Sequence, residues 1–261
     1  MSGAPAVDQA RQAELAADFA RRHTDPELLV LVNVWDVASA QAVAAAPGCR
    51  ALATASAAVA AAYGYPDQEQ IPLQLVLDQL ARIAAAVDLP VTADLEAGYG
   101  DPAGTVRRAV AAGAVGANLE DGLRPRTEAV AAVRAVTAAT DELGIPFVLN
   151  ARTDTYLLGG DRHPDVVLSD TLDRGRAFLD AGASCVFVPG RLSAEVIAAL
   201  VEGFGRGRLS VLGVAGLPSP VELEALGVAR ISYGPYPQRR LLAGLTDLAG
   251  RLHAGDTFPH R

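Results

Sequence analysis

Two pairs of acidic residues stand where strand-like runs end, and they carry the clearest chemical signal in this chain. Asp94 and Glu96 follow one such run, and Glu120 and Asp121 follow the next. Residues two positions apart on a strand point to the same face, so Asp94 and Glu96 would lie side by side. Buried together without a cation, two carboxylates repel and one stays protonated. A hard divalent ion such as Mg²⁺ prefers oxygen ligands and relieves that repulsion, so the pattern predicts a metal site for binding an oxyacid.

Strand-like and helix-like segments alternate along the chain. The strand-like runs are almost all continuously apolar, as expected for strands covered on both faces. Eight such runs cover residues 28–34, 50–55, 90–95, 115–119, 146–151, 184–188, 209–214 and 229–232. Helix-like patterns cover residues 72–87, 105–112, 127–143, 169–181 and 194–203.

Eight β/α units in 261 residues predict an α/β fold, the (β/α)8 TIM barrel, as a single domain over residues 1–261. Residues 1–27 would add an N-terminal helix and residues 236–261 a C-terminal helix. A doubly wound sheet is the structural alternative, but no Gly-x-Gly-x-x-Gly sequence follows the first strand. In a TIM barrel the chemistry gathers where the strands end, and polar residues of this chain are dense at those positions.

The overall composition argues against several classes of protein. A net charge of −8, from 22 Lys and Arg against 30 Asp and Glu, does not suit non-specific nucleic-acid binding, which needs a basic surface. The N-terminal segment has no apolar stretch typical of a signal peptide, and no apolar run is long enough to span a membrane. Cys49 and Cys185 lie far apart in apolar runs, so no disulfide framework is expected. We therefore expect a cytoplasmic protein.

Several short motifs at the predicted strand ends occur in one order along the chain. They are NVWDVASA (33–40), TASAAVAAAYGYPD (54–67), TADLEAGYG (92–100), NLEDG (118–122), NARTD (150–154), FVPG (187–190) and RISYGP (230–235). Each motif alone is weak, but the ordered set is specific. The chain resembles the isocitrate lyase/phosphoenolpyruvate mutase superfamily, as a phosphonomutase-like member without the Cys loop motif of the lyases.

The resemblance implies an α/β barrel whose last helix is swapped between the subunits of a homodimer or homotetramer. It also implies Mg²⁺, with Mn²⁺ as a substitute, that holds the carboxylate of a 2-oxo or enolpyruvyl acid. In this resemblance Asp94 is the direct metal ligand, and Glu96 and Glu120 hold metal-bound waters.

The same resemblance assigns the substrate-binding and catalytic roles. Arg152 would neutralise the substrate carboxylate or a developing enolate. Glu120 and Asp67, the acidic residue of the loop after the second strand, are the other residues expected to take part in catalysis. The backbone at Ala55 and Ser56 would cradle the carboxylate. The other residues expected to line the substrate are Trp35, Asn118 and Asn150.

The loop after the fourth strand departs from the family pattern. The lyases carry a Cys acid/base in a KRCGH-like segment there, and the phosphonomutases carry a Lys-Thr/Asn-Ser segment. This chain has GLRPRTEAV at residues 122–130, in which Arg124 and Arg126 are the charged residues before Glu128. The groups that stabilise an enolate are present, whereas the groups that select the reaction are altered or missing.

Structural explanations compete with these roles for the acidic residues. Asp94 and Glu96 could be solvated loop charges. Glu120 or Asp121 could cap the N-terminus of a helix.

Other candidate residues have structural explanations too. Arg152 could pair structurally with Asp154. Asp67 could cap the turn or helix near residues 68–70, and Trp35 could serve packing.

Three functions remain open from the sequence. The leading hypothesis is a Mg²⁺-dependent lyase acting on a carbon–carbon bond of a small 2-oxo or 2-hydroxy carboxylate through an enolate. The second is a phosphonomutase or phosphonopyruvate-type reaction at a carbon–phosphorus bond, and the third is a non-catalytic 2-oxoacid-binding protein.

Overall fold

The computed structural model describes residues 8–258, and its strands form a single parallel sheet that closes into a barrel. The strand order is β1-β9-β8-β7-β6-β5-β4-β3-β2. The first predicted strand is divided into β1 (Leu29–Leu31) and β2 (Asn33–Val34). β1 pairs with β9 (Arg230–Ser232) and β2 pairs with β3 (Leu52–Thr54), so this one segment closes the barrel. The predicted α/β barrel is confirmed.

The other strands agree with the predicted runs to within a few residues. They are β4 (Val91–Asp94), β5 (Gly116–Glu120), β6 (Val148–Arg152), β7 (Cys185–Val188) and β8 (Leu209–Leu212).

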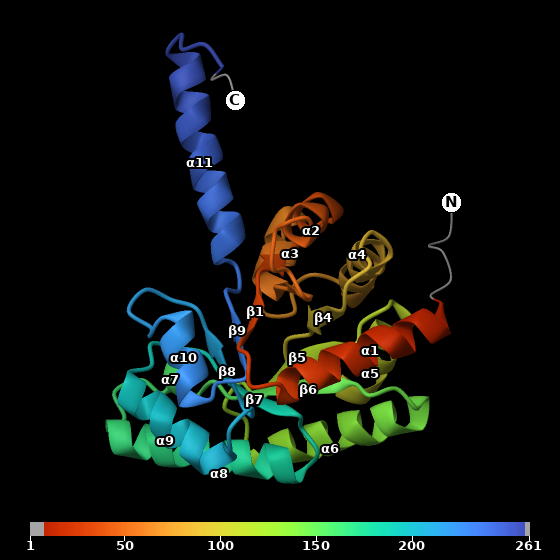
Figure 1. Ribbon diagram of the computed structural model, residues 1–261, viewed down its shortest axis with the longest axis vertical. Helices are drawn as coiled ribbons and strands as arrows, with labels where there is room; N and C mark the ends of the chain where they lie inside the picture. Colours follow the sequence, from red (N-terminus) through yellow and green to blue (C-terminus); the bar gives the residue numbers. More distant parts are fainter. Residues whose placement is uncertain (1–7, 259–261) are drawn as a thin grey trace.

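Helices surround the sheet (Figure 1). They are α1 (Gln9–Thr24), α2 (Val37–Ala44), α3 (Ser56–Ala62), α4 (Leu73–Ala85), α5 (Pro102–Ala111), α6 (Arg126–Leu143), α7 (Thr155–Leu158), α8 (Pro164–Asp180), α9 (Ala194–Phe204), α10 (Pro220–Leu226) and α11 (Tyr236–His253). The sequence did not predict α3, α7 and α10, because helices of 7, 4 and 7 residues are too short to show a helical period. None of the described helices combines the length and the apolar character needed to cross a membrane.

The N-terminal helix α1 covers the barrel at the end where the strands begin. Phe19 is fully buried in a cluster with Leu29, Leu31, Ala51, Ala53, Val115 and Val148. A Cβ atom on Gly116 would lie 2.8 Å from the Phe19 ring, so only glycine fits where Phe19 of α1 packs against the strand. Residues 1–7 of the predicted N-terminal segment lie outside the described chain.

The C-terminal helix α11 projects away from the barrel (Figure 1). Of its residues only Gln238 is buried, and the leucines Leu241, Leu242 and Leu245 are 63%, 53% and 58% exposed. Such an apolar face is expected on a helix that packs against another surface. Residues 259–261 of the predicted C-terminal segment lie outside the described chain.

Candidate active site

Three strands end side by side in charged residues. Asp94 is the last residue of β4, Glu120 of β5 and Arg152 of β6, and Glu120 pairs in register with Arg152. Glu96 follows two positions after Asp94. The structure therefore brings together the three predicted metal-binding carboxylates and the predicted catalytic arginine at the end of the barrel where the strands end.

Arg152 lies between two carboxylates. Its Nη1 atom lies 2.7 Å from Glu120 Oε2, and its Nε atom donates to Asp154 Oδ1 at 2.7 Å. Burial lowers the pKa of Arg152, but the charges of Glu120 and Asp154 outweigh burial and raise it above its usual value. The expected pairing with Asp154 is confirmed, and the sequence did not predict the second pairing, with Glu120. Two carboxylates for one arginine leave excess negative charge at the site.

Glu120 retains a proton more readily than an ordinary glutamate. Its pKa is raised to about 8: burial is the largest cause, Arg152 opposes it, and the charges of Asp94, Asp154 and Glu96 add to it. Repulsion between the neighbouring carboxylates therefore adds to the effect of burial.

Glu96 is buried, with 3% of its surface exposed, so the interpretation of this residue as a solvated loop charge is wrong. Its carboxylate accepts hydrogen bonds from the Glu69 backbone N–H at 2.6 Å and from the Tyr99 hydroxyl at 3.1 Å. Burial, and then the charges of Asp67 and Asp94, raise its pKa to about 7. Glu96 and Tyr99 both have positive φ angles, 52° and 53°, so this loop turns sharply to present the carboxylate.

Asp94 links the cluster to the segment predicted to cradle a carboxylate. Its Oδ2 atom accepts a hydrogen bond from the Ser56 N–H at 3.1 Å, and its own N–H donates to Thr54 Oγ1 at 2.9 Å. Ser56 begins α3, and Ala55 before it is buried. A substrate carboxylate at Ala55 and Ser56 would therefore compete with Asp94 for this N–H.

Two other predicted residues, Trp35 and Asp67, lie at the margin of the candidate site. Trp35 is half-buried against the apolar cluster of Val59, Ala60, Ile71 and Val76, as the packing alternative expects. Asp67 is exposed, and its charge acts on Glu96.

The loop after β5, which is the loop after the fourth predicted strand, is held in place by contacts of its own residues. Asp121 is 2% exposed and forms an ion pair with Arg174 at 3.1 Å, while its Oδ1 atom accepts from the Asp154 N–H at 3.0 Å. Asp121 is not a helix cap, because α6 begins after Pro125. Glu120 is not a cap either, since it ends β5 and pairs with Arg152.

The two loop arginines are also engaged. Arg124 donates to the backbone carbonyls of Glu120 and Asp121, each at 3.1 Å. Arg126 pairs with Asp173 of α8 at 3.3 Å on the exposed outer side.

The cysteines do not compensate for the altered loop. Cys185 begins β7 and is fully buried, which raises the pKa of its thiol to about 12. Cys49 precedes β3, at the opposite end of that strand from the site.

A polar layer lies inside the barrel, one step along the strands from the charged cluster. Asn118 Oδ1 accepts hydrogen bonds from Asn150 Nδ2 at 2.8 Å and from Arg230 Nη2 at 2.9 Å. Asn118, Asn150 and Arg230 are 6%, 0% and 0% exposed, so the two asparagines predicted to bind substrate contact each other and an arginine in the barrel interior. Large aliphatic residues usually fill that position in a TIM barrel. Arg230 within the run ARIS was the available signal, and sequence reasoning missed it.

The residues fit a divalent cation in part. Among residues 8–258 no group of three or more His, Cys, Asp or Glu side chains is arranged to hold a metal ion directly. The donor set is nevertheless made of hard carboxylate oxygens, and Glu96 and Glu120 have pKa values raised to about 7 and about 8 by burial, with repulsion between carboxylates adding to it. One direct ligand and water-mediated contacts, which Mg²⁺ commonly uses, suit this arrangement.

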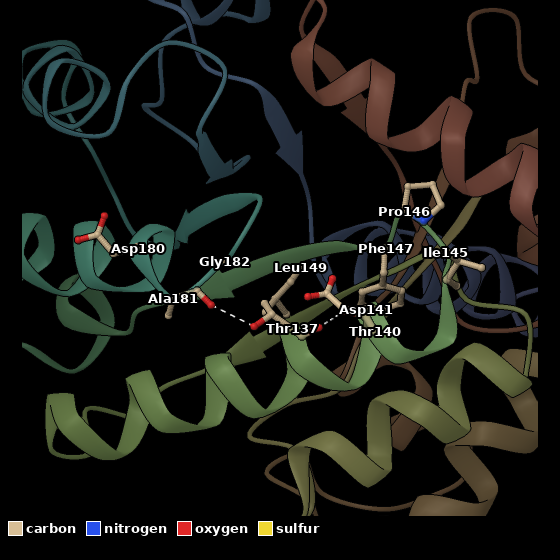
Figure 2. A pocket seen from close by; sticks show the side chains of 10 residues that line it. All are labelled: Thr137, Thr140, Asp141, Ile145, Pro146, Phe147, Leu149, Asp180, Ala181 and Gly182. Atoms are coloured by element: carbon tan, nitrogen blue, oxygen red, sulfur yellow. Dashed lines mark hydrogen bonds between the residues drawn. The ribbon is translucent and has the colours of Figure 1, made fainter.

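Two of the cavities formed by the described residues lie at opposite ends of the barrel. The cavity in Figure 2, about 420 Å³, lies between the end of α6 and the turn after α8, near the start of β6. Thr137 Oγ1 donates to the Ala181 carbonyl at 3.0 Å there (Figure 2). This end supports stability rather than chemistry in TIM barrels.

The second cavity, about 690 Å³, lies at the end of the barrel that carries the charged cluster. We call it the apolar cavity, and it is lined by Tyr156, Leu157, Leu212, Val214, Ala215 and Tyr236, with Gly190, Arg191 and Gly213.

The sequence and the fold of this chain are similar to those of known proteins. A family model described as phosphoenolpyruvate phosphomutase matches residues 19–253. An uncharacterised protein of Mycobacterium tuberculosis is 32% identical over 231 residues, which are 88% of this chain and 86% of that protein.

Solved structures show the same architecture. A Burkholderia cenocepacia protein, provisionally assigned as a phosphonomutase, is 43% identical with a TM-score of 0.85, over 91% of this chain and 99% of that one. Oxaloacetate acetylhydrolase in complex with oxalate is 26% identical with a TM-score of 0.84, over 95% of this chain and 90% of that one. This chain belongs to the phosphoenolpyruvate mutase/isocitrate lyase superfamily.

Proposed function

We propose that this chain is a Mg²⁺-dependent lyase that cleaves a carbon–carbon bond of a small 2-oxo or 2-hydroxy carboxylate through an enolate. The observation that carries the proposal is Arg152, fixed at 2.7 Å by both Glu120 and Asp154 beside Asp94 and Glu96. A fixed cation beside a carboxylate cluster is what the formation of an enolate requires, because negative charge develops on the substrate oxygen.

Asp94 would hold the metal directly, and Glu96 and Glu120 would hold its waters. The metal, when bound, supplies a Lewis acid that polarises the substrate carbonyl. Arg152 orients the substrate carboxylate and neutralises charge on the enolate oxygen. Glu120 and Asp154 hold the guanidinium in place, so little reorganisation is needed as charge develops.

The proton donor in this proposal is water. Residues 122–127 offer no side chain with a pKa suited to proton transfer near neutrality. Decarboxylation and retro-aldol cleavage can proceed with such a donor. We therefore expect weak or no cleavage of isocitrate and methylisocitrate, for which relatives use the missing Cys.

The test is turnover by the purified protein with Mg²⁺. Oxaloacetate, isocitrate, methylisocitrate and phosphonopyruvate are offered separately, and the products are followed by proton and phosphorus NMR. Release of pyruvate or oxalate from oxaloacetate supports the proposal. Robust cleavage of isocitrate or methylisocitrate would contradict the expectation that water is the proton donor. Binding of these acids without turnover would instead identify a 2-oxoacid-binding protein.

A second candidate is a phosphonomutase-type reaction at a carbon–phosphorus bond. The family model and the Burkholderia cenocepacia relative favour it. Against it, Arg124 and Arg126, which would have to steady a phosphoryl group, contact Glu120, Asp121 and Asp173 instead. Conversion of phosphonopyruvate with no carbon–carbon cleavage would establish this candidate in place of the first.

We also propose that the chain forms a homodimer or homotetramer through α11. The exposed leucines of that helix support this, because a single helix standing off the barrel leaves a large apolar surface in water.

A further inference from the structure

The apolar cavity is much larger than a three- or four-carbon acid requires. Its volume of about 690 Å³ corresponds to roughly 20 water molecules at their share of liquid volume. Sites for drug-sized ligands fall in the same range, about 300–1,000 Å³. The reacting atoms of the proposed substrate occupy the charged cluster, so this volume is free for the rest of a ligand.

At the end of the barrel where the strands end, one part is lined by charged residues and another by apolar residues. The charged residues Asp94, Glu120 and Arg152 end β4, β5 and β6, whereas the apolar cavity lies over the ends of β6, β7 and β8 and the start of α11. Its lining is aliphatic at Leu157, Leu212 and Val214 and aromatic at Tyr156 and Tyr236. Arg191 is the charged residue among the lining residues of the described chain, and it is exposed.

Two glycines shape the wall. A Cβ atom on Gly190 would lie 2.8 Å from Tyr156 Cβ, and one on Gly213 would lie 2.4 Å from the Tyr233 ring. These contacts exclude side chains at both positions and let the aromatic rings pack against the backbone. The cavity therefore has a defined wall beside the strand that carries Arg152.

We infer that the apolar cavity receives an apolar or aromatic substituent, larger than methyl, on the third carbon of a 2-oxo or 2-hydroxy acid whose carboxylate lies at Arg152. The inference rests on the proposed function and narrows its substrate class. β6 connects the two parts, because Arg152 ends this strand and Tyr156 follows it in α7. The end of β6 therefore lies between the charged cluster and the apolar cavity.

The first experiment is a calorimetric affinity series with Mg²⁺, using pyruvate, 2-oxobutyrate, 2-oxoisovalerate and phenylpyruvate. Each newly buried methylene is expected to tighten binding about fourfold. We expect phenylpyruvate to bind at least about tenfold more tightly than pyruvate. Equal affinities across the series overturn the inference, including the case in which a segment of a partner subunit fills the cavity.

The second experiment compares two identical substitutions at different places. Val214 lines the cavity, whereas Val221 lies on α10 and is 78% exposed. Val214→Phe should remove the tighter binding of phenylpyruvate relative to pyruvate, and Val221→Phe should preserve it. Equal ratios in the two variants, with melting temperatures close to that of the wild type, overturn the inference.

Arg191→Ala tests the orientation of the ligand. We expect its affinity for phenylpyruvate to change less than twofold, since the carboxylate is anchored at Arg152. A tenfold loss would place the carboxylate in the cavity and overturn the inference. Graded affinity without turnover of any substrate leaves the cavity assignment standing and removes the proposed reaction, whereas turnover with equal affinities does the reverse.

Discussion

At the scale of single residues, the dominant feature is excess negative charge at the end of the barrel where the strands end. Glu96 and Glu120 are surrounded by Asp94, Asp67 and Asp154, with Arg152 as the nearby cation. Their pKa values, raised by burial to about 7 and about 8, express the free energy needed to ionise them in the folded chain.

This charge predicts an unusual dependence of stability on pH. A glutamate ordinarily titrates near 4.5, so between that pH and about 8 the folded chain binds more protons than the unfolded chain. The free energy of unfolding of the metal-free protein should therefore fall as pH rises, by on the order of 2 kcal/mol between pH 6.5 and 8.5. Thermal unfolding in a chelator measures it. Most of the opposing effect of His23 lies below this window, because burial lowers its pKa from 6.5 to about 4.

Two comparisons check the origin of that slope. Glu120→Gln should flatten it, because the residue no longer titrates. Mg²⁺ should raise the melting temperature more at pH 8.5 than at pH 6.5, since the ionised carboxylates bind it better. A wild-type melting temperature that rises across this window would contradict the prediction.

Asp94→Ala should weaken Mg²⁺ binding by about 100-fold or more while the fold persists. The reason is that Asp94, the last residue of β4, is the proposed direct ligand. Calorimetric titration with Mg²⁺ measures the change, and circular dichroism checks the fold. Asp78→Ala is the matched control, because Asp78 is exposed on α4 and does not lie at a strand end. Unchanged Mg²⁺ affinity in the Asp94 variant would refute the assignment.

Arg152→Lys should reduce affinity for oxalate about tenfold or more, because an ammonium cannot reproduce the planar fork of a guanidinium. The same change breaks the double pairing with Glu120 and Asp154. The constants kcat and KM for the active substrate separate binding from chemistry. Wild-type kcat/KM in this variant would mean that Arg152 is structural.

The sequence predicted the residues that end strands and missed those that support them. Asp94, Glu120 and Arg152 follow apolar runs and could be found from that position alone. Arg174 could not, because its partner Asp121 lies far away in the chain, in the loop after β5. Tyr99 could not, because its contact with Glu96 depends on a loop in which both residues have positive φ angles. Arg230 was overlooked since a charge inside a short apolar strand has no local partner that would explain it.

At the scale of elements, the continuous apolar runs located the strands because helices cover their outer faces. The break between β1 and β2 was not predicted, since Asn33 is the one polar residue in the apolar run 28–34 and a single polar residue does not mark the end of a strand. The break arises because this segment pairs with β9 on one side and β3 on the other, and closing a twisted barrel offsets the two registers.

The packing of α1 over the end of the barrel where the strands begin should stabilise the fold and leave the active site unaffected. Phe19→Ala is expected to lower the free energy of unfolding by about 3–5 kcal/mol, as for other buried phenylalanines. Phe19 is fully buried near Gly116, at the opposite end of β5 from Glu120. Urea unfolding measures the loss, and Mg²⁺ affinity of the folded variant should match the wild type. A loss below 1 kcal/mol would show that α1 is not part of the core.

At the scale of the whole molecule, α11 is the element whose position the barrel alone does not explain. A double substitution, Leu241→Arg with Leu245→Arg, should convert the oligomer to a monomer in light scattering, because it places charge on the apolar face. Ala243→Arg is the control, since position 243 lies on the opposite face of the helix. A wild-type protein that is monomeric at micromolar concentration would contradict the proposed assembly.

During synthesis the barrel can close only after its last strand has left the ribosome. Asn33 Oδ1 accepts hydrogen bonds from the N–H groups of Tyr233 and Gly234, each at 2.7 Å, across 200 and 201 positions of the chain. On a ribosome adding about 5–20 residues per second, β1 would wait roughly 10–40 s for β9 to emerge. Throughout that interval the nascent sheet has an unpaired edge that invites association with other chains. The demand for chaperones during translation should therefore be greatest for this chain just before its last strand leaves the exit tunnel.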